Sequence, residues 1–198
     1  MWTYEKRLQF PVKITKPCPK TASLIISHFG GPDGELAASM RYLSQRYSMP
    51  CKEISGLLTD IGTEELAHLE MICAMIFQLT KNLTPEQMKT AGFDAYYVDH
   101  TTALWPTAAA GVPFNACEFQ SKGDAITDLF ENLAAEQKAR TTYDNILRIS
   151  DDPDVNDVIK FLREREVVHF QRFGEAVQLL RDKLNQKNVY YMNPAVDI

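Results

Sequence analysis

Apolar residues recur at helical spacing over three long segments of the chain. The spacing predicts helices over residues 52–80, 125–149 and 155–184, because a helix that packs on a core needs an apolar residue every three or four positions. A fourth and less regular segment extends from about residue 24 to 47. Its apolar face comprises Leu24, Ile25, Phe29, Leu36, Met40, Leu43 and Tyr47. The pattern therefore predicts an all-α protein.

Two Glu-x-x-His steps interrupt these apolar stripes. Glu65 and His68 take stripe positions in the first long segment, and Glu166 with His169 do so in the last one. Glu136 lies among the apolar residues of the middle segment. A carboxylate and an imidazole three residues apart project from one side of a helix, so both can reach one ion. Because burying such groups without a cation is costly, metal binding is the leading hypothesis.

The less regular segment contains the run Gly30-Gly31-Pro32-Asp33-Gly34 just before Glu35. This run predicts either a distorted helix or a helix that restarts at Pro32, and the sequence leaves both open. Glu35 lies beside the apolar stripe rather than at its centre. Tyr42, two turns further on the same side, can donate a hydrogen bond into the same region.

The four segments together offer one Glu from each of two helices and a Glu-x-x-His from each of the other two. This is the pattern of ferritin-like four-helix bundles that hold two metal ions, and the ligand types suit manganese or iron. The alternative is that these histidines are hydrogen-bonded core or interface residues. Two of four histidines with Glu three residues earlier arise by chance in on the order of a few per cent of chains this rich in Glu, so one such step alone means little. His28, outside both pairs, is expected to be a structural or surface histidine.

The chain length and composition predict one domain over residues 1–198, with 45% hydrophobic residues. Residues 1–20 contain three prolines and predict an extended N-terminal arm, followed by the bundle over 21–184 and a tail over 185–198. The net charge of -5 and the lack of a basic run argue against a nucleic-acid partner. We expect no membrane span and no signal peptide, and therefore a protein that stays inside the cell that makes it. Free thiols are expected at Cys18, Cys51, Cys73 and Cys117.

The link between the second and third bundle helices, residues 83–122, is far longer than usual. Its length suits the long crossover of ferritin-like bundles. It is predicted to begin with a short helix capped by Thr84 and Pro85. The alternative that Asp99 or His100 supplies a metal ligand stays open, although the bundle already offers a full set.

Four stretches of the sequence resemble the manganese catalases. They are residues 8–10, 30–36, 59–71, which end in Glu-Glu-Leu-Ala-His-Leu-Glu-Met, and 109–114. The resemblance covers nearly the whole chain and is closest to the short spore-coat branch of that family. It implies that two manganese ions are bound by Glu35, Glu65, His68, Glu136 and His169.

The resemblance also implies roles for two further side chains. Glu166 would exchange protons with peroxide rather than bind metal, whereas the Glu at this position is a ligand in generic di-iron bundles, and both readings stay open. Tyr42 would hydrogen-bond near a bridging carboxylate. Many manganese catalases carry a basic residue beside the third carboxylate, but Ala135 precedes Glu136 here. Arg140, one turn on, is the remaining basic candidate, so we assign this role to no residue.

The expected function is disproportionation of hydrogen peroxide to water and dioxygen by a dimanganese catalase associated with the spore coat. One alternative is a di-iron peroxidase or oxidase, and another is a structural spore-coat protein whose metal site stabilises its bundle. The expected partners are hydrogen peroxide, other spore-coat proteins and further copies of this chain in a homo-oligomer, by resemblance a hexamer.

Overall fold

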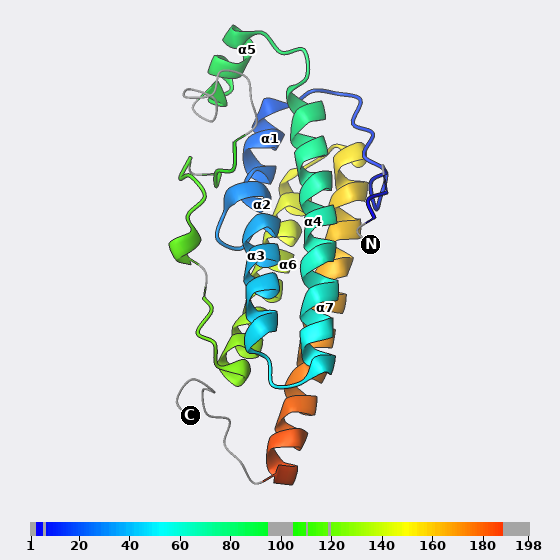
Figure 1. Cartoon of the computed structure of the whole chain (residues 1–198). Coiled ribbons are helices and arrows are strands. Elements are labelled where there is room, and N and C mark those ends of the chain that lie inside the picture. Colours follow the sequence, from blue (N-terminus) through cyan, green and yellow to red (C-terminus); the bar gives the residue numbers. More distant parts are fainter. Residues whose placement is uncertain (1–2, 6, 95–104, 110, 119, 188–198) are drawn as a thin grey trace.

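The computed structural model describes residues 3–5, 7–94, 105–109, 111–118 and 120–187. Within these ranges the chain is mostly helical and forms no strand (Figure 1). The long elements of the bundle are α3 (Glu35–Gln45), α4 (Lys52–Thr80), α6 (Ala125–Ile149) and α7 (Pro153–Lys187). The shorter ones are α1 (Pro19–Ile25), α2 (Ser27–Gly30), η1 (Arg46–Ser48), α5 (Pro85–Thr90) and η3 (Ala116–Glu118).

The predicted long helices are confirmed. The bounds of α4 and α6 are those that the apolar spacing predicts. The last helix is longer than predicted, because it begins at Pro153 instead of residue 155 and continues to Lys187. A proline suits the first helical position, where its missing N–H costs no hydrogen bond. Along the bundle, α3 packs on α4, and α6 packs on α7.

The less regular segment is broken into α1, α2 and α3. Of the two open readings, the restart is correct but its position is not, since α3 begins at Glu35 and not at Pro32. The backbone turns through residues 31–34 so tightly that a Cβ at Gly31 would lie 2.4 Å from the carbonyl oxygen of Ser27. This turn makes Glu35 the first residue of α3.

The predicted apolar face of this segment is confirmed only in part. Ile25 is buried, and Leu36 and Leu43 are partly buried. Met40 of α3 and Tyr47 of η1 are instead 44% and 79% exposed. The buried residues of α3 are Glu35, Ala37, Ser39, Arg41, Tyr42 and Gln45. Most of these side chains are polar. Ser39, Tyr42 and Gln45 bond to neighbouring helices, so their burial follows hydrogen bonding rather than hydropathy.

Close approach of two helices orients α3. The Ser39 hydroxyl donates to the carbonyl oxygen of Gly62 at 2.7 Å. A Cβ on Gly62 would lie 2.9 Å from the side chain of Leu43. Because Gly62 has no side chain, α3 lies against α4 one turn before Glu65.

Two separate hydrophobic clusters form the core. The first contains the α4 residues from Met71 to Leu79 and the start of α7, and the second contains the α4 residues from Ile54 to Ile61 and the later part of α7. Glu65 and His68 lie between these clusters on α4, and Glu166 and His169 lie between them on α7. The bundle therefore has a polar layer at mid-height, enclosed by apolar residues on both sides.

The N-terminal arm and the crossover lie outside the bundle. The arm contacts the end of α4, where the N–H of Cys18 donates to the carbonyl oxygen of Leu79 at 2.8 Å. The predicted short helix is confirmed as α5, which has a capping box between Thr84 and Gln87. Further along the crossover, the backbone at Pro106 lies directly against Gly30 of α2. A Cβ on Gly30 would be only 2.2 Å from that backbone.

Asp99 and His100 lie outside the described residues, as does most of the predicted tail. The ligand alternative for these two residues therefore stays a prediction.

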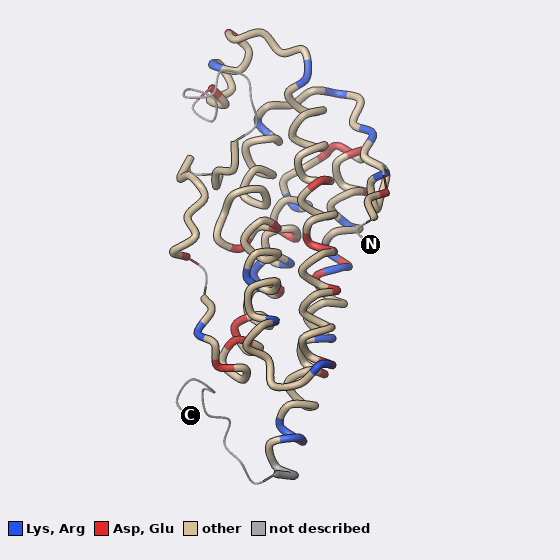
Figure 2. Tube along the Cα trace, viewed as in Figure 1, with Lys and Arg blue, Asp and Glu red and all other residues tan. Residues whose placement is uncertain are grey.

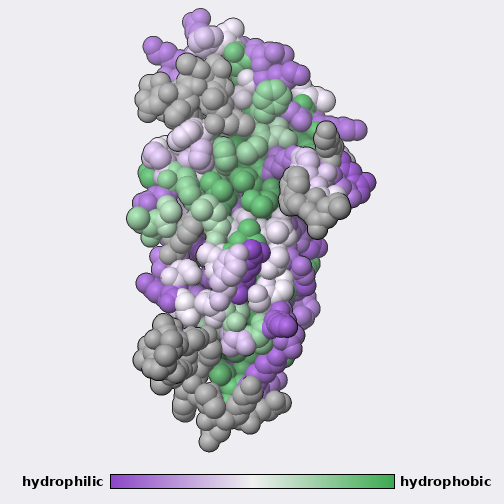
Figure 3. Space-filling view, viewed as in Figure 1, coloured by the Kyte–Doolittle hydropathy of each residue, from purple (hydrophilic) through white to green (hydrophobic). Residues whose placement is uncertain are grey.

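Charges of both signs are interspersed along the coloured part of the chain, and no basic face forms in the view of Figure 2. In the same view, apolar residues gather on the surface beside α1 and α2 (Figure 3). None of the described helices combines the length and apolarity that a membrane span requires.

Candidate metal centre

The polar layer is closed to solvent. Each of the carboxylates and imidazoles predicted for the site is at most 1% exposed. The residues concerned are Glu35, Glu65, His68, Glu136, Glu166 and His169. Their helices bring them together from four separate parts of the sequence, as the apolar stripes predict for every one of them except Glu35. Glu35 was placed beside the stripe, but it is fully buried and belongs to one of two groups of potential metal ligands.

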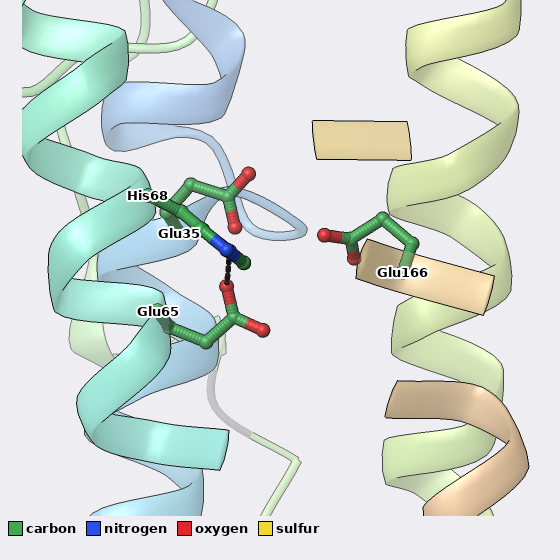
Figure 4. A group of neighbouring side chains, drawn as sticks. All are labelled: Glu35, Glu65, His68 and Glu166. Atoms are coloured by element: carbon green, nitrogen blue, oxygen red, sulfur yellow. Dashed lines mark hydrogen bonds and ion pairs between the residues drawn. The ribbon is translucent and has the colours of Figure 1, made fainter. Parts of the chain in front are cut away.

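The side chains form two overlapping groups. One comprises Glu35, Glu65, His68 and Glu166, and the other comprises Glu65, Glu136, Glu166 and His169. Within each group, one potential ligand atom from every residue lies within 4.8 Å of the others. Figure 4 shows Glu166 approaching the first group from the side opposite Glu65 and His68. Glu65 and Glu166 belong to both groups, so they lie where two ions would share ligands.

The atoms of the layer are poorly satisfied by hydrogen bonds. His169 Nδ1 and Glu65 Oε1 lie 2.8 Å apart, yet neither atom has a hydrogen-bond partner. Glu136 Oε2 and Glu166 Oε1 also lack partners. Close donor and acceptor atoms that do not bond one another are arranged as ligands around a common centre. Because unpaired buried charges are costly, this donor set fits divalent cations.

Electrostatics in the layer favour added positive charge. Burial, together with the neighbouring carboxylates Glu136 and Glu65, raises the pKa of Glu166 well above its ordinary value. Burial is the largest single influence on the pKa of His169 and lowers it, but the charge of Glu65 and the contacts with Glu136, Glu64 and Glu65 together outweigh it and raise that pKa to about 12. The pKa of His68 is likewise raised to about 9, against its burial, chiefly by Glu65. The layer thus holds more negative charge than its histidines can compensate.

Tyrosine hydroxyls hold two of the carboxylates. The Tyr42 hydroxyl donates to Glu136 Oε1, which is the kind of contact expected of this residue. The Tyr143 hydroxyl donates to Glu35 Oε1. The sequence interpretation missed this second contact, because Tyr143 was counted as an apolar stripe residue.

His28 also adjoins the layer. Its ring stacks on Tyr143 with centroids 3.7 Å apart, and His28 Nδ1 lies 3.6 Å from Glu35 Oε1. At 1% exposure it is not a surface residue. Its position after the break between α1 and α2 gave no periodic signal for burial.

Glu64 was also missed by the sequence interpretation. Its carboxylate lies behind both histidines, 3.0 Å from His169 Nε2 and 3.7 Å from His68 Nε2. Arg165 donates to both oxygens of the same carboxylate, at 2.8 and 3.1 Å. Contacts with His169, His68 and Arg165 outweigh partial burial and lower the pKa of Glu64 far below its ordinary value. The spacing of Glu64 and His68, four residues apart on one helix, could have revealed it.

A basic side chain reaches this region from α3. Arg41 is 1% exposed and lines a small cavity together with Glu136 and Glu166. Arg140, the candidate named from the sequence, is instead paired with Asp144 at 2.6 Å. No sequence signal marked Arg41, since an isolated arginine on a short helix normally lies in solvent.

Known proteins resemble this chain over nearly its full length. The model of the family described as manganese containing catalase matches residues 1–190. Protein CotJC of Bacillus subtilis (strain 168) is 56% identical over 190 residues, which are 96% of this chain and 100% of that protein. A probable manganese catalase of Clostridium acetobutylicum is 32% identical over 190 residues, 95% of this chain and 84% of that protein.

A solved structure agrees in fold. The crystal structure of KatB, a manganese catalase from Anabaena PCC7120, matches with a TM-score of 0.83 and 30% identity, covering 91% of this chain and 81% of KatB. This match confirms the predicted ferritin-like bundle. With the family model and the relatives, it shows that the chain belongs to the manganese containing catalases.

Proposed function

We propose that this protein is a dimanganese catalase that converts two molecules of hydrogen peroxide into two of water and one of dioxygen. The observation that carries the proposal is the buried layer in which two ligand groups share Glu65 and Glu166. Family membership supports manganese as the metal. When bound, a manganese pair supplies two-electron redox chemistry, since each ion changes by one electron.

The ligand assignment takes every member of the two groups except Glu166. We propose that the ions are held by Glu35, Glu65, His68, Glu136 and His169. Three carboxylates leave two divalent ions with a surplus of positive charge, which favours an anionic oxygen ligand. Tyr42 and Tyr143 hold Glu136 and Glu35 by hydrogen bonds, so these carboxylates are fixed in orientation.

Glu166 is assigned the acid–base role. Its Oε1 atom has no hydrogen-bond partner, although the residue is 1% exposed. It lies within reach of both ligand groups, so it can take a proton from one substrate molecule and return it to the product. This assignment keeps the charge surplus that a fourth carboxylate ligand would remove.

The decisive experiment supplies manganese or iron separately during expression and then measures bound metal and oxygen evolution from peroxide. We expect two manganese ions per chain and oxygen release. Peroxide consumption without oxygen would indicate the di-iron peroxidase alternative, whose metal the same ligand types accept. A parent protein that binds two manganese ions and evolves no oxygen would favour the alternative of a stabilising metal in a structural protein.

Glu166→Gln tests the acid–base assignment. We expect this variant to keep both ions and to lose oxygen evolution by about 100-fold to 10,000-fold, the usual contribution of a positioned acid–base group. Glu164→Gln is the matched control, because Glu164 lies on the same helix with a side chain that is 67% exposed. Loss of metal from Glu166→Gln alone would show that Glu166 is a ligand.

We further propose that the protein associates with the spore coat as a homo-oligomer. The support is the resemblance to the short spore-coat branch and the 56% identity to Protein CotJC. A fluorescent fusion produced in sporulating Bacillus subtilis should collect around the forespore, and diffuse signal in the mother cell would contradict this. Light scattering of the purified protein tests the hexamer expected from the resemblance.

A further inference from the structure

Arg41 carries hydrogen-bond donors that nothing in the structure uses. The residue is 1% exposed, yet its Nε and Nη1 atoms have no hydrogen-bond partner. Its contacts are a long hydrogen bond from Nη2 to the carbonyl oxygen of Pro32, at 3.5 Å, and a distance of 4.0 Å between Nη1 and Glu131 Oε1. Glu131 also lies 3.6 Å from Lys138 Nζ, so it does not belong to Arg41 alone. A buried guanidinium with idle donors is costly unless a ligand completes it.

Arg41 lines a small cavity whose walls include both outer and buried residues. Exposed Pro32 and partly exposed Asp33 belong to its lining, and so do buried Glu136 and Glu166 of the polar layer. The cavity volume of about 10 Å³ is close to the space that one water molecule needs. The cavity therefore has room for one end of a small molecule, such as one oxygen of hydrogen peroxide, and excludes bulky ones.

Small side chains make room for the guanidinium. Ala38 lies one turn before Arg41 on α3, and Ala135 and Ala139 line the same cavity from α6. A long side chain at position 135 would compete with Arg41 for this space. The basic group of this region consequently comes from α3, while α6 contributes its metal-layer carboxylate Glu136.

We propose that Arg41 binds hydrogen peroxide and anions of its size in this cavity through Nε and Nη1, and orients them toward the polar layer. Nε and Nη1 lie on different edges of the planar guanidinium, so each fixes the direction of one hydrogen bond, which the freely rotating ammonium of a lysine does not do. Arg41 is thereby a residue that determines which molecules enter and how they are held. The inference rests on the proposed catalase function, and it deepens that function by naming the substrate subsite.

The test uses the manganese-loaded full chain and azide, a linear anion of three atoms, as the probe. Azide affinity is measured by calorimetry, metal content by mass spectrometry, and KM and kcat for peroxide by oxygen evolution. Arg41→Gln should keep its manganese but bind azide about 10-fold to 100-fold more weakly, the usual effect of hydrogen bonds from a charged group. Its KM for peroxide should rise more than its kcat falls. Arg41→Lys keeps the charge but loses the two fixed donor directions, so its azide affinity should fall between those of Arg41→Gln and the parent.

Arg140→Gln is the matched control. It removes the same charge from a residue that pairs with Asp144 and does not line the cavity. Its azide affinity should stay within about twofold of the parent, since a paired and partly exposed charge is screened.

Three outcomes of these experiments would overturn the inference. Equal azide affinity in Arg41→Gln and Arg140→Gln, with oxygen evolution intact, would refute the subsite and leave the catalase proposal standing. Full azide affinity in Arg41→Lys would show that Arg41 acts only through its charge, and this variant decides the question if Arg41→Gln does not fold. A parent protein that holds no manganese would refute the proposed function and this inference together.

Discussion

Glu64→Gln tests whether the carboxylate behind the histidines prepares them for metal. Glu64 Oε2 lies 3.0 Å from His169 Nε2, whereas Oε1 lies 3.7 Å from His68 Nε2. On both rings the Nδ1 atom faces Glu65, at 2.8 Å. Nδ1 is therefore the nitrogen that faces the ligand groups, and Nε2–H donates toward Glu64. A carboxylate that accepts this proton fixes the tautomer and makes the ring a better ligand.

The distances from Glu64 to the two histidines determine how much metal affinity Glu64→Gln should lose at each ion. Losing such a partner usually weakens metal binding about 10-fold to 100-fold, or about 1.4 to 2.7 kcal/mol. We expect this loss at the ion beside His169, where Glu64 makes a hydrogen bond. A smaller loss is expected beside His68, because 3.7 Å is too long for one.

The assay is calorimetric titration of metal-free protein with Mn²⁺, which should show two unequal binding steps in Glu64→Gln. Glu53→Gln is the control, since Glu53 lies on the same helix, is 61% exposed and pairs with Lys183. If Glu64→Gln binds each of the two ions as tightly as the Glu53→Gln control does, the reasoning is refuted. An equal loss at the two ions would refute the part of it that depends on the distances.

Three further predictions concern stability and thiol chemistry. Removing the metal with a chelator should lower the melting temperature by roughly 10 to 20 °C, because each of the two proposed Mn²⁺ ions at 100 times its Kd stabilises the fold by about 2.7 kcal/mol. An unchanged calorimetric melting curve would contradict this. Gly30→Ala should destabilise the fold by about 1 to 3 kcal/mol in urea titrations, since its Cβ would meet the Pro106 backbone. Gly174→Ala, with open space around its Cβ, should instead stabilise α7 by about 0.5 to 1 kcal/mol. Burial and Glu70 raise the pKa of Cys73 to about 11, so its alkylation by iodoacetamide should keep accelerating up to that pH, and a plateau near pH 9 would contradict this.

Hydrophobic periodicity predicted α4 and α6 to the residue because each helix buries a broad stripe over many turns. It failed for α3, whose buried face contains Glu35, Arg41 and Gln45. Gln45 is buried because its side chain exchanges two hydrogen bonds with Asn132 on α6, at 2.6 and 3.1 Å. Such a partner is 87 residues away in the chain, so no local pattern could reveal it.

The same physical difference separates the site residues that the sequence revealed from those that it did not. Glu65 and His68 were visible because they replace apolar residues within a stripe, and their polarity contradicts their position. Tyr143 was hidden for the opposite reason, since a tyrosine in a stripe contradicts nothing even when its hydroxyl holds Glu35.

Arg41 and Glu64 belong to a third class, because their roles depend on which helix packs beside them. Polar interruptions of an apolar pattern therefore locate the buried polar layer of such a bundle. The roles proposed for Arg41, and for Glu64 beside His169, emerge only when the helices are assembled.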